Sequence, residues 1–211
     1  MDISDHINPT DTKYISLGST CCISYQLQQL NLRNKAYPFD WIRTKSLKKV
    51  IKCLESSFDG FTDLEYLDIK KEFTFQESDD FRLDAVTGII SAKNKYNMTF
   101  LHDFAKNNID DKPKVIDKYN RRIEHFYQTI NDQSINIVFV RYDTSYNEKN
   151  IFDLIKILDQ ISKANYKLLV IINTIKSKLI QPNPKLIIKQ IDSHTDDWKL
   201  DNIDWNILFK I

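Results

Sequence analysis

The stretch Asn136-Ile-Val-Phe-Val-Arg141-Tyr142 holds four consecutive apolar residues before it turns polar at Arg141. Apolar side chains on both faces are typical of a strand in a parallel sheet that helices cover on both sides. A second such run, Lys167-Leu-Leu-Val-Ile-Ile-Asn173, follows a helical pattern at residues 150–163. A strand, a helix and another strand in this order predict a βαβ unit and a parallel sheet.

The same alternation extends toward both ends of the chain. Residues 13–18 predict a strand that stops at Gly18, and residues 20–30 predict a helix with Ser19 as its N-cap. We expect further elements as follows: helices at 45–58 and 113–131, a strand at 185–191, and a short helix or strand in the tail at 198–211. The predicted fold is α/β, with a mostly parallel sheet flanked by helices on both faces in a three-layer, Rossmann-like arrangement.

The length and composition predict one α/β domain over residues 1–211. A chain of 211 residues of which 42% are hydrophobic is large enough to bury a core without disulfides. Residues 59–97 mix acidic turns with one short strand at 72–75. We expect an irregular insertion there, which would form a lid or a small subdomain.

Charge and cysteine usage exclude several classes of protein. The chain has 30 basic and 29 acidic residues, without the basic excess of a nucleic-acid-binding protein. Its three cysteines are an odd number and two are adjacent, which indicates a reducing compartment. The sequence has neither a signal-peptide pattern nor the run of about 18 apolar residues that a membrane span needs. We expect an intracellular, cytoplasmic protein. The sequence indicates no particular oligomeric state.

Polar residues follow the apolar runs at the expected strand ends. Gly18-Ser19 precedes Cys21, the apolar run at 98–101 ends in His102-Asp103, and the other two runs end at Arg141 and Asn173. Ligands of a parallel α/β sheet bind outside the carboxyl ends of its strands. We therefore expect these residues to meet at one edge of the sheet.

Cys21 has the position of a reactive thiol. It falls in the first turn of the predicted helix, where free amides and the helix dipole favour a thiolate. It also lies opposite the apolar stripe of Ile23, Leu27 and Leu30, so core packing does not require it. The alternative is a small buried hydrophobic residue, and position alone leaves both open. For Cys22 and Cys53 we expect packing roles.

A thiol nucleophile needs a base, and His102 is the preferred one because it follows an apolar run at the expected edge. His194 is the second choice. Asp40 and Asp103 are candidates to orient the histidine or to bind substrate. The alternatives are a loop histidine held by hydrogen bonds and, for Asp40, a loop-capping aspartate.

Several residues are expected to bind substrate. Arg122 and Arg141 offer guanidinium groups that suit a carboxylate or phosphate, and Ser19, Trp41 and Asn173 complete the expected set. The chain has no C-x₂-C or H-E-x-x-H pattern and no phosphate-binding glycine loop, so we predict neither a metal site nor a cofactor.

The stretch Ile15-Ser-Leu-Gly-Ser-Thr-Cys21 resembles the start of a family of unknown function in bacteria and large DNA viruses, catalogued as "putative papain-like cysteine peptidases". Further similarity covers these segments: Leu30-Asn-Leu-Arg33, Pro38-Phe-Asp-Trp41, His102-Asp103, Arg121-Arg122 and Phe139-Val-Arg141. The resemblance extends from about residue 13 to 175. It implies Cys21 as the nucleophile and His102 as the base. The resemblance also implies an association with surface-glycan genes, and so acyl or sugar transfer as a variant.

The function that we predict is a thiol-dependent hydrolase or acyl transferase with a Cys–His dyad, acting on a peptide, acyl or glycan substrate. One alternative is a non-catalytic module that binds a glycan or a small anion through Arg141, Trp41 and Asp40. Others are a transferase in surface-glycan synthesis and an enzyme relic without turnover.

Overall fold

The main sheet of the protein is parallel, as the sequence predicts. The computed structural model describes residues 11–63, 68–72, 89–100, 102–103, 112–143, 147–173, 182–192 and 198–211. Four parallel strands form the sheet in the order β1-β6-β7-β8. Their bounds are β1 (Thr12–Ser16), β6 (Asn136–Asp143), β7 (Asn165–Ile172) and β8 (Leu186–Gln190).

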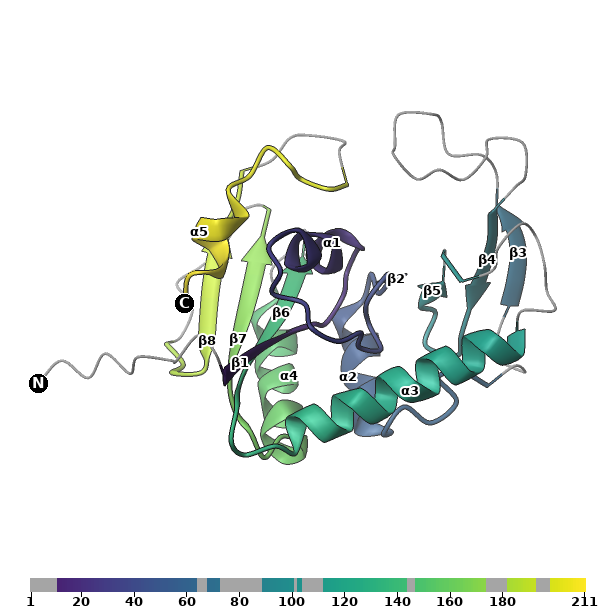
Figure 1. Ribbon diagram of the computed structural model, residues 1–211, viewed down its shortest axis with the longest axis horizontal. Coiled ribbons are helices and arrows are strands. Elements are labelled where there is room, and N and C mark those ends of the chain that lie inside the picture. Colours follow the sequence, from purple (N-terminus) through teal and green to yellow (C-terminus); the bar gives the residue numbers. More distant parts are fainter. Residues whose placement is uncertain are drawn as a thin grey trace, which may run out of the picture.

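Helices cover both faces of this sheet (Figure 1). They are α1 (Cys22–Gln29), α2 (Leu47–Glu55), α3 (Lys112–Ile130), α4 (Glu148–Ile161) and α5 (Trp205–Phe209). Along β6, Ile137 and Phe139 pack in one apolar cluster with side chains of α2, α3 and α4, whereas Val138 and Val140 pack with α1 and α5. This alternation follows from the two-residue period of a strand. The predicted three-layer arrangement is confirmed.

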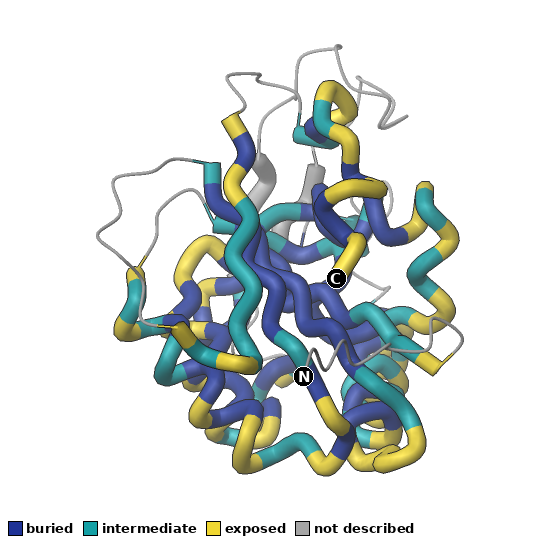
Figure 2. Tube along the Cα trace, turned by 90° about the vertical axis from the view of Figure 1, so that its left-hand side faces the viewer, coloured by how far each residue is buried: buried dark blue, intermediate teal, exposed yellow. Residues whose placement is uncertain are grey.

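The central strands lie in the interior of the molecule, where Figure 2 shows them as buried. Every residue of β7 from Leu168 to Ile172 is at most 2% exposed. The apolar runs that we read in the sequence are therefore strands enclosed between two layers of helices. Within the described ranges, no helix is both long enough and apolar enough to cross a membrane.

A second, antiparallel sheet stands apart from the main one (Figure 1). Its strand order is β2-β5-β4-β3. The strands are β2 (Ile42–Arg43), β3 (Asp68–Glu72), β4 (Ile89–Lys93) and β5 (Thr99–Phe100). β3 and β4 fall in the segment 59–97 that we expect to be an insertion, and β3 begins four residues before the short strand predicted at 72–75. Residues 73–75 lie outside the described part of the chain.

Candidate active site

The turn after β1 is built around Gly18. Leu17 N donates to Val140 O at 2.8 Å, which extends the pairing of β1 with β6 by one residue. The chain then reverses with a φ of 75° at Gly18, where Gly18 N donates to Ser16 Oγ at 3.1 Å. A Cβ atom at this position would lie 2.3 Å from Thr44 Oγ1. Glycine is thus required here for both its backbone conformation and its lack of a side chain.

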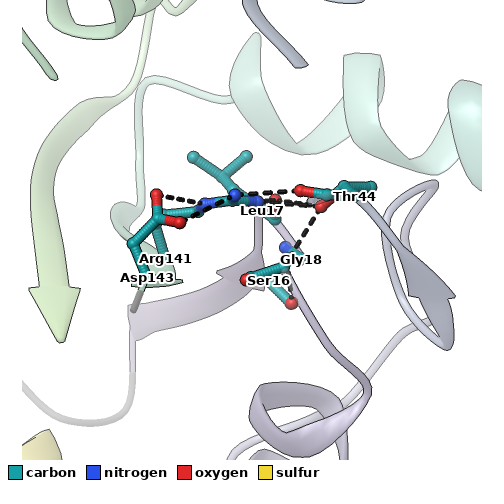
Figure 3. Close-up of polar contacts among 7 residues, drawn as sticks. Ser16, Leu17, Gly18, Thr44, Arg141 and Asp143 are labelled. Carbon is teal, nitrogen blue, oxygen red and sulfur yellow. Dashed lines mark hydrogen bonds and ion pairs between the residues drawn. The ribbon is translucent and has the colours of Figure 1, made fainter. Parts of the chain in front are cut away.

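A buried arginine holds this turn in place (Figure 3). Arg141 Nη1 donates to Leu17 O at 3.0 Å and to Thr44 Oγ1 at 2.8 Å, and Nη2 donates to Thr44 O at 2.9 Å. Its Nε donates to Asp143 Oδ2 at 3.2 Å. Arg141 is 0% exposed. We expected Arg141 among the substrate-binding residues. In the structure, its guanidinium instead donates to groups of the protein and is buried away from solvent.

Ser19 is not the N-cap of α1. Its φ is 98°, its amide donates to Thr44 Oγ1 at 2.7 Å, and its carbonyl accepts from Thr44 N at 3.0 Å. Helix α1 begins at Cys22, so Cys21 occupies the N-cap position, without a side-chain cap hydrogen bond. The prediction of Ser19 as N-cap is wrong because the tight turn at Gly18 and Ser19 delays the helix by two residues.

The turn leaves two backbone amides available near the thiol. The amides of Gly18 and Ser19 are occupied by Ser16 Oγ and Thr44 Oγ1. Within the described ranges, the amides of Thr20 and Cys21 make no hydrogen bond. They belong to Cys21 itself and to the residue before it, and backbone amides are among the groups that can stabilise an oxyanion.

The sulfur of Cys21 lies 3.5 Å from His102 Nε2. We call these two residues the dyad. Cys21 is 6% exposed and His102 is partly buried. His102 follows β5, which belongs to the antiparallel sheet and not to the edge of the parallel sheet from which we predicted it. The pairing of Ile42 with Phe100 in β2 and β5 brings this segment toward Cys21 instead.

Burial keeps both members of the dyad neutral. Burial raises the pKa of the Cys21 thiol to about 12; Arg43 lowers this pKa, and the charge of Asp103 raises it. Burial also lowers the pKa of His102, which Asp103 opposes and Arg43 reinforces. The resting pair is therefore a thiol beside a neutral imidazole. Burial of the sulfur therefore opposes the thiolate that the helix N-terminus is expected to favour, and it outweighs the nearby positive charge of Arg43 in its effect on the pKa of Cys21.

Asp103 is covered and has two partners on α3. Tyr119 Oη donates to its Oδ2 at 2.9 Å, and Lys118 Nζ forms an ion pair with its Oδ1. Its charge raises the pKa of the neighbouring His102. A fixed carboxylate next to the ring favours the imidazolium that forms when the histidine takes a proton.

Asp40 ties α1 to the loop that precedes β2. Its carboxylate accepts from Ser24 Oγ at 2.9 Å, from Arg33 Nε at 3.0 Å and from Tyr37 N at 2.9 Å. Asp40 is 1% exposed. These contacts fix the backbone next to Trp41, whose φ is 63°. They match the loop-capping alternative more directly than an orienting bond to the histidine.

Trp41 and Arg122 lie around the dyad. The ring of Trp41 meets that of His102 edge-on, with 6.1 Å between centroids. Arg122 Nη1 donates to Asp40 O at 3.1 Å, and its guanidinium stacks 4.9 Å from the centroid of Tyr119. Trp41 is thus the expected binding residue with the most direct relation to the histidine.

The remaining expected residues lie elsewhere. Asn173 follows β7, where its amide donates to Asp143 O at 3.3 Å and its side chain bonds to Tyr142. His194 lies outside the described residues. Cys22 donates to Lys199 O at 3.4 Å and Cys53 is fully buried in α2, so both have the packing roles expected of them. In the segments that the structure covers, no group of three or more His, Cys, Asp or Glu side chains could hold a metal ion.

The sequence analysis missed Arg43 and Thr44. Arg43 acts electrostatically on both members of the dyad, and Thr44 binds the turn before Cys21. They lie two and three residues after Trp41, so the residues next to this expected binding residue were the signal that could have indicated them. Nothing in the local pattern, however, indicates that this strand pairs with the segment before His102.

Comparison with known proteins identifies the family of the chain. Residues 12–178 match the model of the family described as "Putative papain-like cysteine peptidase (DUF1796)". The chain is 29% identical over 215 residues to "Uncharacterized protein R408" of Acanthamoeba polyphaga mimivirus, in an alignment that covers 92% of this chain and 96% of that protein. No solved structure matches the chain. Because the family model covers most of its length and includes both members of the dyad, the chain belongs to the family described as putative papain-like cysteine peptidases (DUF1796).

Proposed function

We propose that the protein is a thiol-dependent hydrolase or acyl transferase in which Cys21 is the nucleophile and His102 the general base. The observation that carries this proposal is the 3.5 Å distance between Cys21 Sγ and His102 Nε2. The two residues come from segments 81 positions apart. A nucleophile within hydrogen-bonding reach of a base is the geometric signature of covalent catalysis.

The reaction starts from the neutral pair. His102 Nε2 takes the thiol proton as Cys21 Sγ forms a bond to the substrate carbonyl carbon, whose π electrons move to the oxygen. The tetrahedral intermediate collapses, the bond to the leaving group breaks, and that group takes the proton from His102. The product of this half-reaction is a thioester on Cys21.

The second half-reaction determines the class of the enzyme. His102 removes a proton from water, or from the hydroxyl or amine of an acceptor, as that nucleophile attacks the thioester. The bond between carbon and sulfur then breaks and the proton returns to Cys21. Water as nucleophile gives hydrolysis of a peptide or ester, and an acceptor such as a glycan hydroxyl gives acyl transfer.

Neighbouring groups support the charges that develop in these steps. The amides of Thr20 and Cys21 can donate to the oxyanion, since the two preceding amides are occupied within the turn. Asp103 favours the imidazolium by its negative charge. A thiol with a pKa of about 12 needs this assistance, because little thiolate forms at neutral pH without proton transfer to the base.

The non-catalytic alternative has less support. It assigns ligand binding to Arg141, Trp41 and Asp40, but Arg141 is 0% exposed and Asp40 is 1% exposed. Both have their polar atoms engaged by the protein. Of the three residues, only Trp41 would then be available to contact a ligand. The alternative also leaves the short distance between the Cys21 thiol and the His102 imidazole unexplained.

Alkylation with iodoacetamide, followed at each cysteine by mass spectrometry, tests the proposal. We expect Cys21 to react much faster than Cys22 and Cys53, which serve as internal controls because they are also buried. His102→Asn should slow the reaction at Cys21 by roughly 10²-fold or more, the usual contribution of a general base. Equal, slow labelling of all three cysteines in the folded protein would contradict the proposal.

A second measurement looks for the thioester itself. An activated ester such as p-nitrophenyl acetate should release p-nitrophenol and leave an acetyl group on Cys21, visible as a mass increase of the intact chain. Cys21→Ser should remove this adduct, and Cys22→Ser should not.

A further inference from the structure

Trp41 has a backbone conformation that is strained for a tryptophan. Its φ is 63°, in the left-handed region that residues with bulky side chains rarely adopt. The preceding turn is fixed by Asp40, whose carboxylate accepts from Tyr37 N at 2.9 Å and whose amide donates to Tyr37 O at 3.2 Å. Arg122 Nη1 on α3 donates to the Asp40 carbonyl at 3.1 Å. The buried contacts of Asp40 therefore maintain a conformation that the next residue disfavours, and strain of this kind is typical of functional sites.

The side chain of Trp41 is not part of the core. Phe39 and Ile42, which lie close to it in the sequence, are 0% exposed and belong to the larger apolar cluster. Trp41 is partly exposed, and among the residues that the structure describes neither apolar cluster includes it. Packing of the core therefore does not explain why a tryptophan occupies this strained position.

Within the described ranges, the ring of Trp41 has its contacts in the candidate site. It meets the ring of His102 edge-on, with 6.1 Å between centroids, and the guanidinium carbon of Arg33 lies 6.0 Å from its own centroid. Arg33 also forms an ion pair with Asp40 at 3.0 Å. Because His102 Nε2 lies 3.5 Å from Cys21 Sγ, the strained backbone places an indole on the imidazole that contacts the thiol.

We propose that Trp41 is a specificity-determining residue that binds an apolar group of the substrate, preferably an aromatic ring, next to the carbonyl that Cys21 attacks. A carbonyl within reach of Cys21 Sγ also lies close to His102, so a group a few bonds away from it can reach the indole. The indole offers a flat apolar surface, on which aromatic groups gain stabilisation beyond that from burial alone. This inference rests on the proposed thiol chemistry and adds a substrate class to it: a peptidyl or acyl group with a large apolar side chain.

Iodoacetamide and its N-benzyl derivative test this preference with the same reactive group. In both reactions a bond forms from Cys21 Sγ to carbon, iodide leaves with the electrons of the carbon–iodine bond, and the thiol proton goes to His102. We define the benzyl preference as the ratio of the two second-order rate constants at Cys21 divided by the same ratio for glutathione, which removes the intrinsic difference between the reagents. We expect a benzyl preference of roughly five- to twentyfold, the effect of removing about 40–70 Å² of apolar surface from water.

Variants of Trp41 should change the benzyl preference. Trp41→Gly removes the ring, and because glycine adopts a φ of 63° without steric cost, the backbone of the site is retained. We expect the rate-constant ratio of this variant to fall to that of glutathione. Trp41→Phe keeps a smaller aromatic ring and should retain part of the preference.

The stability of the variants separates a role in binding from a role in packing. Phe58 is the matched control, because it is also an aromatic residue at positive φ, 62°, but is 5% exposed and packs against the rings of Phe39 and Phe61. Phe58→Gly should lower the melting temperature by roughly 5–10 °C through lost core packing and leave the benzyl preference unchanged. Trp41→Gly should lower it by less than about 3 °C, since relief of the backbone strain offsets the lost ring contacts.

The possible results separate this inference from the proposed function. A wild-type ratio equal to that of glutathione, or an unchanged benzyl preference in Trp41→Gly, overturns the inference. The proposed function then stands if iodoacetamide still selects Cys21 and depends on His102. If Trp41→Gly does not fold, or melts as early as Phe58→Gly, the ring has a packing role and the inference is also overturned. A Cys21 that reacts with neither reagent defeats both proposals.

Discussion

Arg141 binds Thr44 twice, from Nη1 to the side-chain Oγ1 at 2.8 Å and from Nη2 to the carbonyl at 2.9 Å. Since Thr44 Oγ1 also accepts from Ser19 N, one buried guanidinium connects β6, the segment after β2 and the turn that leads to Cys21. The geometry of the turn before Cys21 therefore depends on a residue that is sealed from solvent. This dependence leads to the first prediction.

Replacement of Arg141 should destabilise the protein and disturb the site. Arg141→Met removes the donors for Leu17 O and Thr44 O and leaves the Asp143 carboxylate without its ion pair. Loss of one member of a buried ion pair typically costs about 3–5 kcal/mol. We expect a decrease of this size in the free energy of unfolding, measured by urea denaturation. Arg121→Gln, at an exposed position, should change it by less than about 0.5 kcal/mol, and equal effects would contradict the role of Arg141.

Gly18→Ala should be far more harmful than the same change at Gly60. Both glycines have positive φ, 75° and 61°. A Cβ at Gly18 meets Thr44 Oγ1, which is fixed by hydrogen bonds, whereas one at Gly60 meets the flexible end of Lys95. The positive φ alone costs about 1–2 kcal/mol at each position. We expect a much lower melting temperature for Gly18→Ala, together with slower alkylation of Cys21. Similar melting temperatures for the two variants would show that the side chain of Thr44 can move away from the added Cβ atom.

The reactivity of Cys21 should depend on pH through His102. Burial lowers the pKa of His102 from 6.5, so the imidazole remains a neutral base at pH 6.5 and above. The rate of alkylation should be level near neutral pH and fall as the pH decreases through the lowered pKa, when protonation removes the base. His102→Asn should abolish this acid limb. A rate that instead rises through pH 8–9 in both proteins would indicate an independent thiol.

His102 should also make the protein less stable in acid. Its pKa is lower in the folded state than in the unfolded state, so the unfolded chain binds more protons as the pH falls below 6.5. The stabilisation from this residue is therefore present above pH 6.5 and lost as the pH decreases. We expect the melting temperature of His102→Gln to fall less steeply between pH 7 and pH 5 than that of the wild type. If the melting temperatures of the two proteins decrease equally with pH, the lowered pKa of His102 is contradicted.

Asp40 should stabilise the fold more than a surface aspartate does. Asp40→Asn weakens its contacts with Arg33 and the amide of Tyr37 inside the protein, and we expect a loss of about 2–4 kcal/mol. Asp59→Asn is the control, because the side chain of Asp59 is 76% exposed in its ion pair with Lys95, and such pairs contribute at most about 1 kcal/mol. Equal losses in urea denaturation would contradict the difference between the two ion pairs.

The parallel sheet could be predicted because its strands are marked by their own residues. The runs at 136–142 and 167–173 are apolar at nearly every position, which is a local signal, and each is a central strand. β2 and β5 have only two residues each and carry no such signal. Their pairing is determined by tertiary contacts, so no local pattern indicates that Arg43 acts electrostatically on Cys21 and His102.

The residues of the candidate site were easier to predict than the elements that carry them. His102 was chosen because it follows an apolar run, and it does lie next to Cys21, but the run belongs to the other sheet. The protonation state of Cys21 could not be predicted either. It depends on how much solvent the surrounding chain excludes, and a short sequence pattern does not contain that information.

The pairing of β1 with β6 has a consequence for how the protein is made. Thr12 aligns with Asn136, so the strand that precedes Cys21 can pair only after its partner strand has left the ribosome during translation. Closing so long a loop is entropically costly and slows folding. A nascent chain therefore carries Cys21 for most of its synthesis without the sheet that positions it, and the turn that holds this cysteine forms late.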